Sequence, residues 1–73
     1  MRTHYTLQSM RQGRLISEMY STSDAAEAPD VARQLAHPTG QHDAVALVRV
    51  ETAPSADGQG YHVISRIILE IVS

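Results

Sequence analysis

The C-terminal segment YHVISRIILEIVS, residues 61–73, constrains the fold more than any other part of this chain. Apolar residues occupy both alternating sets of positions along it. One set carries Ile67, Leu69 and Ile71, and the other carries Ile64, Ile68 and Val72. An antiparallel strand with one face in water normally alternates apolar and polar side chains. This segment therefore predicts a strand that needs cover on both faces.

The small size of the chain makes such cover hard to supply from within. A domain of 73 residues buries only about 60% of the surface that its unfolded form exposes, so its stability is marginal without help. Disulfides and thiolate metal sites are ruled out because the chain has no cysteine. A second copy of the chain is the simplest remaining support, and we expect a homo-oligomer, with a dimer first.

Charge and composition narrow the classes of partner. Six basic residues, all arginine, stand against eight acidic ones, for a net charge of −2 with the signs interspersed. Nucleic-acid binders usually carry a basic stripe, so we expect no nucleic-acid partner. We also expect no leader and no membrane segment, hence a cytoplasmic protein. The absence of lysine, asparagine and phenylalanine follows a GC-rich coding bias and predicts a bacterial or phage gene.

The first part of the chain predicts a β-hairpin. Residues Thr3–Met10 alternate as a strand does, and Arg14–Ser21 read as the returning strand. Gly13, between them, can adopt the positive φ that a three- or four-residue hairpin loop requires.

The pattern becomes alanine-rich and helical after this hairpin. Asp24 and Glu27 have the spacing of a capping box, and Pro29 favours the first turn of a helix. We therefore expect a turn over Asp24–Ala28 and a helix over Pro29–His37, ended by Pro38 and Gly40. The stripe that would face the sheet consists of Ala28, Val31, Ala32, Leu35 and Ala36.

Two further strands, His42–Thr52 and Tyr61–Ser73, complete a β-β-α-β-β chain of one domain, residues 1–73. The predicted class is α+β, with an antiparallel four-stranded sheet and one helix on one face. The longest and most apolar strand should be central, which favours the strand order 1-2-4-3. The order 2-1-3-4 is also antiparallel throughout and is kept as the alternative.

A helix of this length cannot cover both faces of the sheet, so one apolar face is expected to mediate association. Which face meets the helix is left open. The predicted association face consists of Ile64, Ile68 and Val72 from the last strand and Ala46, Val48 and Val50 from the third.

Residues that could carry chemistry are few and scattered. The four histidines have no spacing fixed by one helix or tight turn, the serines lack a nucleophile context, and no phosphate loop is present. We expect no catalytic, cofactor-binding or metal site. Arg11 and Arg14 flank Gly13 and form a small candidate basic surface, whose simplest interpretation is solvated arginine.

Three functional hypotheses follow. The first is a non-enzymatic interaction module that self-associates through an apolar sheet face and binds another macromolecule, such as an unidentified protein. The second is a phage- or plasmid-type inhibitor that occludes a site on a host complex. The third is a small-molecule-binding or catalytic subunit whose pocket forms between protomers.

Overall fold

The computed structural model describes residues 1–37 and 39–73, so the predicted role of Pro38 as a helix stop lies outside the described residues. The α+β class and the β-β-α-β-β order are confirmed. The elements are β1 (Arg2–Arg11), β2 (Arg14–Thr22), α1 (Glu27–Leu35), β3 (Ala44–Pro54) and β4 (Tyr61–Val72).

The four strands form one antiparallel sheet in the order β2-β1-β3-β4. The preferred order 1-2-4-3 was wrong, and the sheet adopts the order kept as the alternative. Both orders keep every strand pair antiparallel, so strand direction could not separate them. The two central strands are β1 and β3, of which β3 is buried from Ala44 to Val48, and the more apolar β4 lies at the edge.

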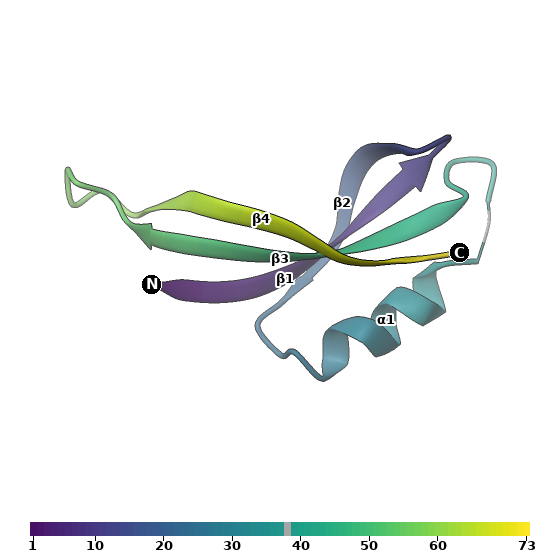
Figure 1. The fold of residues 1–73 in the computed structure, drawn as a ribbon, viewed down its shortest axis with the longest axis horizontal. Coiled ribbons are helices and arrows are strands. Elements are labelled where there is room, and N and C mark those ends of the chain that lie inside the picture. Colours follow the sequence, from purple (N-terminus) through teal and green to yellow (C-terminus); the bar gives the residue numbers. More distant parts are fainter. Residues whose placement is uncertain (38) are drawn as a thin grey trace.

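The sheet is twisted and longer than the helix that packs on it. Figure 1 shows α1 beneath one end of the sheet, while the β3–β4 hairpin extends away from the helix toward the opposite end. The molecule is correspondingly elongated, with principal extents of 42 × 24 × 16 Å. A nine-residue helix is only about 14 Å long at 1.5 Å per residue, so much of the sheet lies beyond its reach.

The core lies between α1 and the two central strands. Ala28 and Ala32 are fully buried against a cluster that includes Leu7, Val45 and Leu47. The predicted helix stripe is confirmed, since Val31, Leu35 and Ala36 also join this cluster. Alanine side chains bring the helix backbone close to the sheet, so the larger strand residues can fill the interface without voids.

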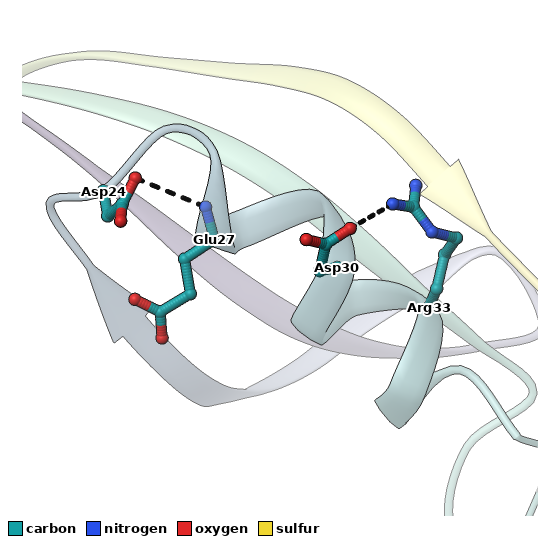
Figure 2. Close-up of polar contacts among 4 residues, drawn as sticks. All are labelled: Asp24, Glu27, Asp30 and Arg33. Atoms are coloured by element: carbon teal, nitrogen blue, oxygen red, sulfur yellow. Dashed lines mark hydrogen bonds and ion pairs between the residues drawn. The ribbon is translucent and has the colours of Figure 1, made fainter.

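The helix starts two residues before the predicted Pro29 and ends at Leu35. The Asp24 carboxylate accepts hydrogen bonds from the backbone N–H of Ala26 (2.9 Å) and of Glu27 (3.3 Å; Figure 2). These bonds satisfy donors that a helix start leaves free, which allows the earlier start. Pro29 is the third residue of α1 and still fits the first turn.

The β1–β2 hairpin is tighter than predicted. Arg11 pairs with Arg14, so the loop has only two residues, Gln12 and Gly13. Both have positive φ, 53° and 80°, as the two central residues of a type I′ turn do. The twist of that turn matches the strands, which explains why no longer loop is needed.

Truncating Leu7 should cost far more stability than truncating Ile67. Leu7 is 1% exposed in the helix–sheet core, whereas Ile67 is 42% exposed on β4. Leu7→Ala should cost about 2–5 kcal/mol, most of the stability of a small domain, while Ile67→Ala should cost less than about 1 kcal/mol. Urea denaturation at the lowest practical protein concentration measures both, and the reverse ranking would contradict this core assignment.

Replacing Gly13 should weaken the first hairpin. Its φ of 80° lies in the left-handed region, where Gly13→Ala introduces a backbone penalty of about 1–2 kcal/mol. Gly40→Ala is the matched control, because Gly40 is not in that region and a Cβ there would meet no atom within 4 Å. Thermal denaturation should show a lower Tm for the Gly13 variant only, and equal Tm values would refute the turn assignment.

Candidate interaction surface

Strand β4 exposes a continuous series of large apolar side chains. Its exposed members, all 42–54% accessible, are Val63, Ile64, Ile67, Ile68, Leu69 and Ile71. They are exposed because β4 is the edge strand: β3 is its only neighbour in the sheet, and α1 packs mainly over β1, β2 and β3. Its outer N–H and C=O groups therefore have no strand partner within the described part of the chain.

Two irregularities in β4 redistribute its side chains between the faces of the sheet. Leu47 pairs with Glu70 and Val48 with Ile68, which leaves Leu69 as an extra residue. Ile64 is extra in the same way, between the pairs formed by Ser65 and Val63. Such bulges shift the alternation by one residue, and no period-two interpretation of the sequence could include them.

The predicted association face is consequently divided. Ala46, Val48 and Val50 do share the face opposite the helix, here called the open face, and Ile68 joins them as the partner of Val48. Val72 instead pairs with Val45 and packs against the helix-side core, while Ile64 occupies one of the two bulges. The bulges are the reason, because each one reverses the facing of the residues beyond it.

The centre of the open face is already covered by its neighbours in the sheet. Ala46 is fully buried and Val48 is 3% exposed, so β3 offers little surface to a partner. A cleft of about 610 Å³ lies beside Val48, and Figure 1 shows how the twist carries β2 away from the β3–β4 arm. The cleft is lined by Gln8, Leu15, Ile16, Ser17, Glu18, Val48, Arg66 and Ile68.

Sequence reasoning missed the contribution of β2 to this cleft and of several β4 residues to the exposed surface. Leu15 and Ile16 are both about half exposed, and their adjacent positions in a short strand were a signal that both faces of β2 are apolar. Ile67, Leu69 and Ile71 had been placed in the set opposite the predicted association face. Their exposure follows from the edge position of β4, which residue patterns could not reveal.

Of the two arginines of the first hairpin, Arg11 has a structural role. The Arg11 guanidinium donates a hydrogen bond of 2.7 Å to the Gly40 carbonyl and so ties the hairpin to the loop after α1. Gln12 strengthens this link, since its backbone N–H donates to the Asp43 carboxylate (3.1 Å). Arg14 stands opposite Arg11 at the exposed hairpin end.

The one buried histidine, His42, caps the C-terminal end of α1 from the following loop. Nε2 of His42 donates a 3.0 Å hydrogen bond to the Leu35 carbonyl, and Thr39 contacts the other ring nitrogen at 3.3 Å. His42 thereby satisfies a carbonyl that the last turn of α1 leaves free. Among residues 1–37 and 39–73, no group of three histidine or carboxylate side chains is arranged to hold a metal ion.

The other polar contacts around α1 join it to β2 and to itself. Glu27 accepts hydrogen bonds from the hydroxyls of Tyr20 and Thr22, and the bond to Glu27 raises the pKa of Tyr20 above its ordinary value. Asp30 and Arg33 form an exposed ion pair along the helix (Figure 2). These contacts orient the helix.

None of the helices in the described part of the chain has the length and apolar character needed to cross a membrane. Comparison with known proteins gives no relative from which a role could be transferred. No family model matches the chain, and no curated protein and no solved structure matches it.

Proposed function

We propose that this protein is a non-enzymatic interaction module whose contact surface is β4, both its free edge and its exposed apolar side chains. The proposal covers association with itself and with another protein. One observation carries it: a twelve-residue edge strand exposes large aliphatic side chains along almost its whole length. The contact surface is thus the edge strand rather than the central residues of the open face.

The physical chemistry of sheet edges supports this role. An edge strand presents unpaired backbone donors and acceptors, and soluble proteins usually protect such strands with lysine, proline, β-bulges or a covering element. β4 contains neither lysine nor proline, and its charged side chains are limited to Arg66 and Glu70. Its two bulges are a kind of irregularity that protects some edges, but β4 is otherwise a long and apolar edge, the kind of template to which another strand can be added.

The energy available from these side chains is sufficient for association. Each large aliphatic residue gains about 1.5–3 kcal/mol when it moves from full exposure to full burial. The exposed residues of β4 are already half covered, so each retains roughly half of that gain. Several such contacts on each of two copies, together with new backbone hydrogen bonds, give a gross gain that offsets the loss of translational and rotational freedom on association.

The cleft on the open face favours a second candidate function, the binding of a small molecule. Its volume of about 610 Å³ lies within the usual range for ligand sites. Its lining combines aliphatic residues with a carboxylate from Glu18 and a guanidinium from Arg66. A ligand there would have both an apolar part and polar groups of either charge.

Self-association should be visible as a mass that rises with concentration, and a charge on β4 should weaken it. Light scattering of the unmodified protein should give more than the 8.0 kDa of one chain at micromolar concentration. Ile71→Asp should weaken association by about tenfold or more, the equivalent of 1.4 kcal/mol. Ile16→Asp is the matched control, because Ile16 is equally exposed, at 54%, but lies on β2 at the other edge of the sheet.

The Ile16→Asp control also distinguishes β4 from the cleft side of the sheet as the site of self-association. A mass of one chain over the whole micromolar range would refute self-association. A stronger loss with Ile16→Asp than with Ile71→Asp would transfer the interface from β4 to the side of the cleft.

The cleft can be tested separately with a fragment library that contains small amphipathic acids and amines. Binding there should shift the NMR methyl signals of Val48 and Ile68, and Arg66→Met should remove the shifts caused by the acids. Unchanged methyl signals throughout the library would reject the cleft as a ligand site.

A further inference from the structure

We infer that β4 binds β4 of a second copy, antiparallel and in a single register in which Ile67 lies opposite Ile67 of the other chain. This inference rests on the proposed function, because it specifies the partner of the same strand. It follows from the order in which the β4 side chains face the two sides of the sheet.

The facing of each β4 residue is fixed by its partner on β3. Val45 and Leu47 of β3 face the helix-side core. The β4 residues paired with Val45, Leu47 and every second β3 residue after them therefore face the helix, and those paired with the intervening β3 residues face the open side. The helix-side group of β4 is His62, Ser65, Ile67, Glu70 and Val72. The open-face group is Tyr61, Val63, Arg66, Ile68 and Ile71.

The order of helix-side and open-face residues along β4 is nearly symmetric about Ile67. Arg66 and Ile68, on either side of it, both lie on the open face, as do Val63 and Ile71, four residues away in each direction. The bulges follow the same symmetry. The stretches Ile64–Ser65 and Leu69–Glu70, each of which contains one extra residue, both lie two to three residues from Ile67.

A twofold axis perpendicular to the sheet keeps each face continuous across the two copies, so opposed residues must face the same side. With the axis at Ile67, Arg66 lies opposite Ile68, Val63 opposite Ile71 and His62 opposite Val72, and both members of each pair face the same side. The two bulged stretches lie opposite each other. Two antiparallel copies of β4 are therefore complementary in this register.

Neighbouring registers fail on facing or on charge. An axis at Ile68 would place Arg66, on the open face, opposite Glu70, on the helix side. An axis at Arg66 preserves the facing but puts two guanidinium groups directly opposite each other, which destabilises a strand pair. In the register centred on Ile67, each Arg66 meets an Ile68 and each Glu70 meets an Ile64.

The surrounding fold leaves room for this pairing. The main contacts of α1 are with β1, β2 and β3 rather than with β4. The product is a continuous antiparallel sheet of eight strands, four from each copy, with both helices on the same face. The pairing satisfies the free backbone groups of β4 and covers Ile64, Ile67 and Leu69 along the seam.

Single cysteines test the register, because the natural chain has none. Directly opposed residues of an antiparallel pair lie about 4.5–5.5 Å apart between Cα atoms, within the range of a disulfide. Ile67→Cys should therefore form a disulfide-linked dimer under mild oxidation. Val63→Cys alone should link at least about tenfold less, because two copies of position 63 would be roughly 27 Å apart.

Mixing variants gives the complementary result. Val63→Cys mixed with Ile71→Cys should produce a linked heterodimer, since these positions oppose each other in the proposed register. Ile16→Cys, on the other edge of the sheet, measures linkage by random collision. Circular dichroism checks that each variant keeps the fold.

The outcomes distinguish this inference from the function on which it rests. If the unmodified protein self-associates and Ile71→Asp weakens it, but Ile67→Cys links no better than Ile16→Cys, the register is refuted and the β4 surface stands. If the unmodified protein stays monomeric at micromolar concentration, both the self-pairing and the proposed self-association fail.

Discussion

The packing of Ala28 and Ala32 against Leu7, Val45 and Leu47 is the contact on which the rest of this molecule depends. It is the only layer-to-layer core in the described residues, and it joins the helix to the two central strands. Small residues on the helix allow close approach, so the large strand side chains supply most of the buried apolar surface. Hydrogen bonds from the flanking segments hold the helix over that contact, through Asp24 at its start and His42 at its end.

The short reach of this core accounts for the exposed surface. The helix covers one face at one end of the sheet, and the β3–β4 arm extends beyond it (Figure 1). Residues on the central strands are still buried by their neighbours on both sides, as Ala46 and Val48 are. An edge strand has only one neighbour, so the same kinds of side chain remain half exposed on β4. Exposure here is a consequence of position in the sheet rather than of composition.

The bulges of β4 connect local geometry to the proposed interface. Each extra residue shifts the alternation, and two shifts spaced about Ile67 produce the symmetric order of facings. Without them, a regular strand could match its reverse about any residue, and its register would be weakly specified. With them, facing and charge together select one register. A feature that interrupts the ladder with β3 can thus specify pairing on the opposite edge.

The sequence by itself determined the local elements of this protein. Alternation and apolar runs predicted the strands, and the alanine stripe predicted the buried face of the helix, because these features depend on neighbouring residues alone. The predicted helix start at Pro29 was two residues too late. It also showed that apolar residues occupy both alternating sets of positions in the last strand, from which we predicted a partner. The tertiary structure alone decided that β3 is central and β4 is at the edge, since both strand orders satisfy the same pairing directions. It also decided which side chains of β4 share a face, because a bulge arises from the register between two strands and neither strand encodes it separately.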